Sequence, residues 1–213
     1  MERNNLRPHL VMSMTDYAAQ ALKHFEINTE LLRFRLLTGT SGHASIKRSV
    51  GSVELMLPYG FNFSDPDRQR WLILIIIREL RFQACHILPP RLDEFARQYN
   101  LRHQRTCIKN ITSRWGSCSS LGNINLSLWL MLAPKELADY VILHELAHLN
   151  EMNHGPHFWA EVDRMTHNQG RALERKMKQF SLQTAVMFKV FNQITRGFQL
   201  KYNHFTNPKK MRI

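Results

Sequence analysis

The stretch DYVILHELAHLNEMNHGPHFW, residues 139–159, decides the fold that we expect for this chain. It continues a segment that begins at Pro134 and carries apolar residues throughout, which predicts a helix in the core of a domain. Within that helix, His144 and His148 are four residues apart. Because each residue turns a helix by about 100°, the two imidazoles return to nearly the same face, one turn apart. Their nitrogens can therefore reach one ion.

Zinc is the metal that this pair of histidines favours. It accepts neutral imidazole nitrogens in a tetrahedral site, and catalytic sites leave one position for water. A bound zinc ion lowers the pKa of that water toward about 7 and polarises a substrate carbonyl. Glu145 lies beside His144, where its carboxylate can take the proton of the water as general base. The pattern therefore predicts a metallohydrolase with one zinc ion per chain, and a peptidase before other hydrolases.

A third metal ligand is expected shortly after this helix. His154 precedes a Gly-Pro turn that can fold the chain back toward the first two histidines. His157 falls at the start of the following helix, and Glu161 lies inside it. From the residues alone we favour His154, and the other two stay open as alternatives.

Upstream of the motif helix the sequence predicts a small sheet. The runs TCIKNIT, residues 106–112, and NINLSLWL, residues 123–130, are separated by a turn-rich stretch. Apolar and polar residues alternate in the second run, which is typical of a strand with one buried face. We expect the two runs to form a hairpin. An earlier stretch rich in β-branched residues predicts another strand or hairpin that begins near Ile46.

Further helices are expected in the first half of the chain. Threonine caps and helical spacing predict two short helices, Thr15–Phe25 and Thr29–Leu37, as a helical N-terminal extension. The Asp-Pro pair at residues 65–66 starts a long helix, and the proline pair at residues 89–90 should end it. A separate short helix is then expected over Arg91–Tyr99.

Composition and cysteine content indicate a folded protein of a reducing compartment. With 213 residues, 44% of them hydrophobic, the chain has room for one globular domain and an appendage. Its longest apolar run, Trp71–Ile77, is far shorter than the roughly 20 residues of a membrane helix, so no membrane association is expected. The N-terminus carries no secretory pattern, and the three cysteines lack C-x-x-C spacing. These features predict a cytoplasmic location.

The net charge of +12 is concentrated near the C-terminus. From Arg164 to the end, eleven Lys or Arg residues accompany one acid, Glu174. Such a region can bind nucleic acid or another polyanion, because neutralising phosphates releases counterions. A solvated helix face that aids solubility explains the same charges, and both interpretations stay open.

Two stretches carry a resemblance to a known family. SRWGSCSSLGNINLSLWL, residues 113–130, followed by the opening stretch, resembles the YgjP-like metallopeptidases, which are distantly related to the SprT-like (Spartan) proteases. The resemblance extends over about residues 46–180. It implies an α+β, zincin-like metallopeptidase domain in which a small sheet packs against the helix that carries HExxH. The chain departs from the family pattern at Thr166–His167, where relatives tend to carry proline.

The resemblance also implies the identity of the site residues. Zinc would be held by His144, His148 and His154, the last within an Asn-His-small residue segment, with Glu145 as the catalytic base. That pattern supports His154 over the two alternatives.

Four neighbouring residues are candidates for supporting roles. Arg114 and Trp115 match the family's RWGS signature, and Asn125 lies in the matching strand, whose edge would pair with an extended substrate. These three are predicted to bind substrate, although a tight turn with a packed tryptophan explains the signature equally well. Tyr140 lies one turn before His144, where it either hydrogen-bonds to that imidazole or fills the core.

These observations predict three parts and one leading function. The parts are a helical extension, residues 1–44, a metallopeptidase domain, residues 45–180, and a basic C-terminal helix or tail, residues 181–213. The leading function is cleavage of peptides or proteins by zinc-activated water. The alternatives are a nucleotide pyrophosphatase, for which no glycine-rich phosphate loop is present, and a SprT-like protease acting on DNA-associated proteins.

Overall fold

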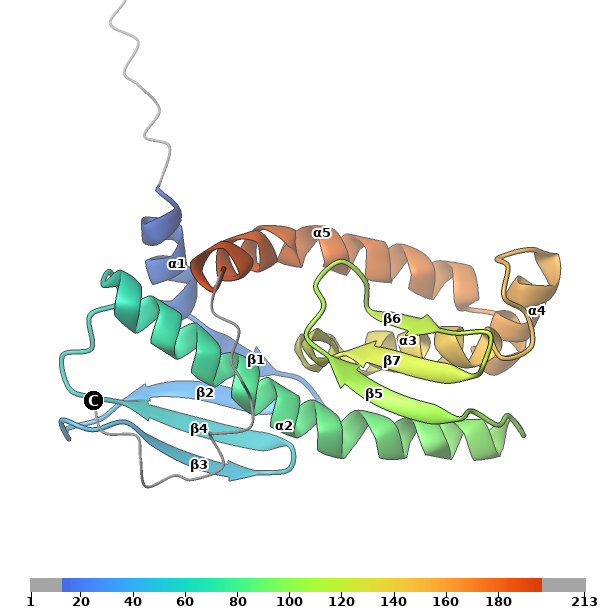
Figure 1. The fold of residues 1–213 in the computed structure, drawn as a ribbon, viewed down its shortest axis with the longest axis horizontal. Coiled ribbons are helices and arrows are strands. Elements are labelled where there is room, and N and C mark those ends of the chain that lie inside the picture. The colour runs from blue at the N-terminus through green and yellow to red at the C-terminus, as the bar shows by residue number, and fades with distance from the viewer. Residues whose placement is uncertain (1–12, 197–213) are drawn as a thin grey trace, which may run out of the picture.

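The computed structural model describes residues 13–196 and shows a mixed α+β fold with two small sheets (Figure 1). Within these residues the helices are α1 (Met14–Lys23), α2 (Pro66–Gln98), α3 (Lys135–Ala147), α4 (Pro156–Met165), α5 (Gly170–Ile194) and a 3-10 helix, η1 (Leu128–Leu132). The strands are β1 (Glu26–Asn28), β2 (Arg33–Thr38), β3 (Ser45–Ser49), β4 (Ser52–Leu57), β5 (Arg105–Lys109), β6 (Gly116–Cys118) and β7 (Asn123–Ser127). The predicted α+β class is confirmed. No helix among the described residues is long and apolar enough to cross a membrane.

The first sheet has the strand order β1-β2-β4-β3. Its hairpin of β3 and β4 confirms the strands predicted from near Ile46. The helix predicted over Thr29–Leu37 is wrong, because most of that stretch forms β2, which runs parallel to β4. Phe34 is fully buried between two exposed arginines, which is the period of a strand. The Thr29 hydroxyl accepts the backbone N–H of Leu32, so it caps a turn and not a helix.

Helix α2 continues through the two prolines that were expected to end it. Its start is as predicted, with the Asp65 carboxylate accepting the backbone N–H groups of the first turn. The prolines at residues 89–90 remove the N–H groups that would bond to the carbonyls of Cys85 and His86. Both of those residues are exposed, so water can solvate the carbonyls. Fully buried leucines on both sides of the prolines, Leu88 and Leu92, keep the helix on the core.

The second sheet has the order β5-β7-β6. The predicted strands are present, but the expected hairpin between them is wrong, because β5 and β7 are parallel and the hairpin partner of β7 is β6. The predicted alternation ends at Ser127, where the chain turns into η1. Leu128 and Leu130 are nevertheless fully buried, so the pattern correctly marked core residues within the wrong type of element.

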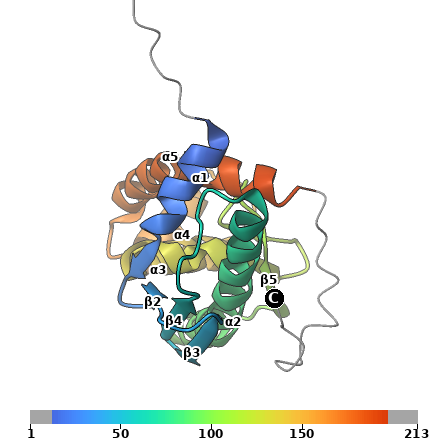
Figure 2. The same cartoon turned by 90° about the vertical axis from the view of Figure 1, so that its left-hand side faces the viewer.

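Helix α3 lies in the core between the second sheet and α5, and α5 runs along one side of the molecule (Figure 1). At one end of the molecule, α1 packs against α2 and α5 (Figure 2). Residues before 45 and after 180 therefore share a core with the middle of the chain. The boundaries at residues 44/45 and 180/181 stay a prediction, and the basic residues beyond residue 196 lie outside the described part.

Substituting Gln83 tests how α2 holds the first sheet. This fully buried amide accepts the backbone N–H of Gly51 and donates to the carbonyl of Ser49, both at 2.8 Å, in the turn between β3 and β4. We expect Gln83→Met to lower the free energy of unfolding by about 1–3 kcal/mol, because both backbone groups lose their partner. Urea titration measures the change. The exposed Gln98→Met is the control, and equal stability of the two variants would contradict the role.

Candidate metal centre

The last turn of α3 carries the candidate metal ligands. Ile142, Leu146 and Ala147 on this helix are almost or fully inaccessible to solvent, so core packing holds it in place. His144 and Glu145 lie in the final turn, and His148 is the residue that ends the helix. Because the helix is buried, the backbone that carries these three residues has little freedom to move.

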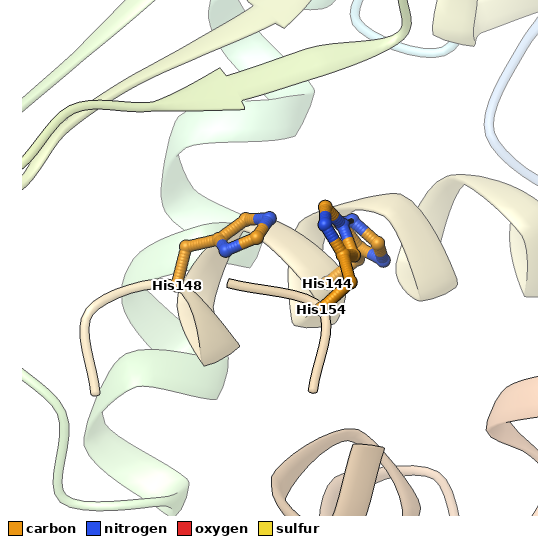
Figure 3. Close-up of side chains that lie close together, drawn as sticks. All are labelled: His144, His148 and His154. Atoms are coloured by element: carbon orange, nitrogen blue, oxygen red, sulfur yellow. Dashed lines mark hydrogen bonds between the residues drawn. The ribbon is translucent and has the colours of Figure 1, made fainter. Parts of the chain in front are cut away.

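Three imidazoles from two segments converge at this point (Figure 3). The Nε2 atoms of His144 and His154 are 3.0 Å apart, and one nitrogen from each of the three rings lies within 4.8 Å of the others. The chain reaches His154 after leaving α3 and then turns sharply, with the Gly155 N–H donating to the Asn153 carbonyl before α4 begins. The structure thus brings together the three predicted ligands, His144, His148 and His154.

Outer hydrogen bonds select the nitrogen that two of the three rings present. The Nδ1–H of His148 donates to the Glu151 carbonyl at 3.0 Å, which leaves Nε2 as the free lone pair. The Tyr140 hydroxyl lies 3.4 Å from Nδ1 of His144, so the Nε2 of that ring also faces the cluster. The predicted contact of Tyr140 is therefore present, and the tyrosine is also buried. Together with the His154 imidazole, these two rings offer three nitrogens, the donor set that Zn²⁺ accepts.

Aromatic residues that the sequence did not single out support the cluster. The buried ring of Phe158 on α4 contacts all three imidazoles, with centroid distances of 4.9, 4.5 and 4.6 Å. Trp159 lies beside it, and the Arg171 guanidinium of α5 stacks 3.5 Å from its ring centroid. In the sequence these residues follow an ordinary amphipathic pattern, so only the position of α4 reveals their role.

Burial shifts the ionisable groups of the centre. Desolvation, together with the neighbouring histidines, lowers the pKa of His144 to about 3, and desolvation also lowers the pKa of His148. Both rings are therefore neutral, which is the form that binds metal. Desolvation raises the pKa of Glu145 to about 8, and the nearby Arg114 guanidinium opposes part of that shift. A bound cation would act in the same direction as Arg114.

Glu145 packs against the backbone of β6 at Gly116. A Cβ atom at position 116 would lie 2.6 Å from Oε1 and 2.7 Å from Cγ of Glu145, closer than atoms can approach. Glycine is thus the residue that lets the carboxylate lie between α3 and the sheet. The sequence identified Gly116 only as part of a signature. The need for glycine there comes from the close packing of Gly116 against Glu145, which is almost thirty residues later in the chain.

The two alternative third ligands lie outside the cluster. Glu161 accepts hydrogen bonds from Asn150 and Arg164, which hold its carboxylate on the side of α4. His157 is exposed in the first turn of the same helix and is not among the histidines that converge.

The three residues predicted to bind substrate have different surroundings. Arg114 is exposed just before β6 and close enough to Glu145 to affect its charge. The Trp115 indole donates to the Ser181 hydroxyl at 2.8 Å and packs on Phe180 of α5. Asn125 lies on β7, the central strand, and donates to Ser117 at 3.3 Å. The expectation that the edge of this strand is open is wrong, because β7 is paired on both sides.

One protein-family model matches more than half of the chain. The model of the YgjP-like family, described as a metallopeptidase domain, matches residues 43–180. No curated protein matches the chain. Among solved structures, the crystal structure of the metallopeptidase zymogen of Methanocaldococcus jannaschii jannalysin is similar, with 26% identity and a TM-score of 0.38. That similarity covers 43% of this chain and 94% of the other.

Removing the Tyr140 hydroxyl should weaken metal binding. Tyr140→Phe keeps the ring but takes away the group beside Nδ1 of His144, so the imidazole is less firmly oriented. We expect the affinity for Zn²⁺ to fall about tenfold, measured by competition with a chelating dye. Tyr59→Phe, at a side chain that is 77% exposed, is the control. An unchanged affinity in Tyr140→Phe would contradict the positioning role.

Adding a methyl group at position 116 should displace Glu145 without removing a metal ligand. In Gly116→Ala the new Cβ and the carboxylate cannot both keep their places. We expect kcat for peptide cleavage to fall about a hundredfold, while bound zinc, measured by elemental analysis, is retained. Gly42→Ala, whose Cβ would meet nothing within 4 Å, is the matched control. Wild-type kcat in Gly116→Ala would show that the close approach is unimportant.

Proposed function

The chain belongs to the YgjP-like metallopeptidase family, and on this basis we propose that it is a zinc peptidase in which Glu145 is the general base. The family establishes a metal-dependent hydrolase of peptides or proteins. The identity of the ion and the roles of the residues are our proposal. The proposal rests mainly on the convergence of three imidazole nitrogens. A carboxylate, Glu145, lies in the same helical turn as one of these histidines, His144.

His144, His148 and His154 would hold the ion through their Nε2 atoms. When bound, zinc supplies a Lewis acid that polarises the scissile carbonyl and lowers the pKa of water. The protein contributes orientation, because Tyr140 and the Glu151 carbonyl hold two of the rings from behind. Such outer partners fix the imidazoles before the ion arrives.

Glu145 would move the proton. Its carboxylate lies next to the metal ligands in sequence and is held between α3 and β6. It accepts a proton from the attacking water and then donates that proton to the leaving amine nitrogen of the substrate. Because the residue is only 6% exposed, little bulk water competes for this proton.

The free edge of β6 would align the peptide. The Trp115 carbonyl and the Ser119 N–H bond toward β7, and backbone groups alternate in direction along a strand. The backbone groups of Gly116 and Cys118 therefore point away from β7, beside Glu145. An extended peptide can add to this edge as a further strand, which places its carbonyl groups next to the centre. Arg114 stands at the end of this edge, whereas the contacts of Trp115 favour a packing role.

Two further proposals rest on smaller observations. Cys85, Cys107 and Cys118 are free thiols, which supports a cytoplasmic location.

Nucleic-acid binding through the basic C-terminal region stays a prediction. In α5, Lys176 pairs with Glu136 and Lys178 pairs with Glu174, so these cations are less available to a polyanion than the sequence suggests.

Two substitutions separate metal binding from proton transfer. We expect wild-type protein to contain about one zinc ion per chain and Glu145→Gln to keep it, because glutamine retains the shape of the side chain. Peptide cleavage by this variant should fall about 10²–10⁴-fold, since an amide is not a base. Elemental analysis and cleavage of a quenched fluorescent peptide library measure the two quantities.

His154→Ala should lose zinc as well as activity. The matched control is His157→Ala, which removes an exposed imidazole three residues away and should keep both. Full zinc content in His154→Ala would exclude that ligand, and full activity in Glu145→Gln would exclude the general base.

A further inference from the structure

A cavity of about 350 Å³ lies between α5 and the loop that joins β5 to β6. In Figure 1 this loop rises from the second sheet to α5. One wall is formed by Thr112, Ser113 and Trp115 from the loop, and the opposite wall includes Phe188, Lys189 and Asn192 from α5. The volume is at the lower end of ligand sites in proteins, which suits one or two residues of a peptide.

The walls of this cavity are tied together. The Asn192 amide donates to the Thr112 hydroxyl at 2.8 Å, and the Trp115 indole donates to Ser181 at 2.8 Å. Behind the loop, the Ser127 hydroxyl donates to the Ile111 carbonyl at 2.6 Å. Hydrogen bonds on both sides therefore fix the loop, so the cavity is formed before any ligand enters it.

The chemistry of the lining favours a negatively charged group. Among the described residues that line the cavity there are hydroxyls, an amide and the Lys189 ammonium, but no Asp or Glu. Other cations of α5, such as Lys176 and Lys178, are neutralised by glutamates, whereas Lys189 is exposed and has no ion-pair partner within residues 13–196. The aromatic rings of Trp115 and Phe188 complete the walls and can contact the aliphatic part of a side chain.

Neighbouring residues of the chain connect the cavity to the proposed substrate edge. Trp115 forms its wall, and the next residue, Gly116, contacts Glu145. Arg114, exposed and close to Glu145, adds a second cation at this junction. A peptide on the edge of β6 would therefore run toward the cavity.

We propose that this cavity is a subsite for an acidic side chain of the peptide substrate, with Lys189 as its charged partner. The inference rests on the proposed peptidase function and specifies its substrate class. An aspartate or glutamate at that position gains a charge-assisted hydrogen bond from Lys189. The net charge of +12 adds a long-range attraction for acidic peptides.

Quenched fluorescent peptides test the subsite. A set that differs only in carrying Glu, Gln or Lys at one position, scanned over three residues on each side of the scissile bond, is cleaved by zinc-loaded full-length protein. At one position we expect kcat/KM for Glu to exceed that for Gln by about tenfold, the lower end of the effect of a charge-assisted hydrogen bond. Lys189→Glu should reverse the order, so that the Lys peptide becomes the better substrate.

The control is Arg175→Glu, an equal change of charge at an exposed residue of α5 that does not line the cavity. We expect it to keep the ratio of Glu to Gln cleavage. The subsite is overturned if Lys189→Glu leaves the ratio of Glu-peptide to Gln-peptide kcat/KM unchanged. It is also overturned if Lys189→Glu and Arg175→Glu lower that ratio equally.

Binding separates this inference from the proposed catalysis. In the zinc-loaded Glu145→Gln background, which should hold peptide without cleaving it, fluorescence anisotropy gives the Kd of the Glu and Gln peptides. Tighter binding of the Glu peptide, by about tenfold and abolished by Lys189→Glu, supports the subsite whether or not turnover is seen. Equal Kd values for the two peptides overturn it, whereas loss of cleavage alone by wild-type protein counts against the proposed catalysis.

Discussion

Three imidazole nitrogens from two separate segments have to meet at one point, and the fold around them follows from that constraint. Two of the histidines share the end of α3, which is held in the core by residues such as Leu146. The third arrives only because the helix ends at His148 and the chain turns back over the next few residues, before α4 begins at Pro156. Phe158 then packs against all three rings, so α4 is part of the support of the metal centre and not an appendage.

The same packing builds the surface on which a substrate would lie. Because Gly116 has no side chain, β6 approaches α3 closely enough to hold Glu145 between them. The central strand β7 pairs with β6 on one side, and no other strand within residues 13–196 pairs with the opposite edge of β6. The loop before β6 is tied to α5 through Trp115, so the metal centre, the substrate edge and the neighbouring cavity depend on one set of contacts.

The sequence predicted the elements and residues whose neighbours in the chain decide their conformation. The motif helix and the hairpin of β3 and β4 carry their own periodicity, and His154 lies beside the other two histidines, as the sequence predicted. The strand β2 was misread as a helix because pairing with β4, about twenty residues later, outweighs its local pattern. Likewise, α2 continues past Pro89 because buried leucines on both sides hold it on the core. The residues whose carbonyls lose a hydrogen-bond partner there are exposed to water. The role of Gly116 was invisible, because it depends on which strand lies beside α3.

The central claim concerns the atoms that surround the ion, so X-ray absorption at the zinc edge of the purified, zinc-loaded protein tests it most directly. The structure leads us to expect three imidazole nitrogens at about 2.0–2.1 Å, with the rest of the shell made of oxygen and no sulfur. A sulfur neighbour at about 2.3 Å would point to a cysteine such as Cys118, and fewer than three imidazoles would remove one of the histidines. Either result would contradict a zinc site built from His144, His148 and His154.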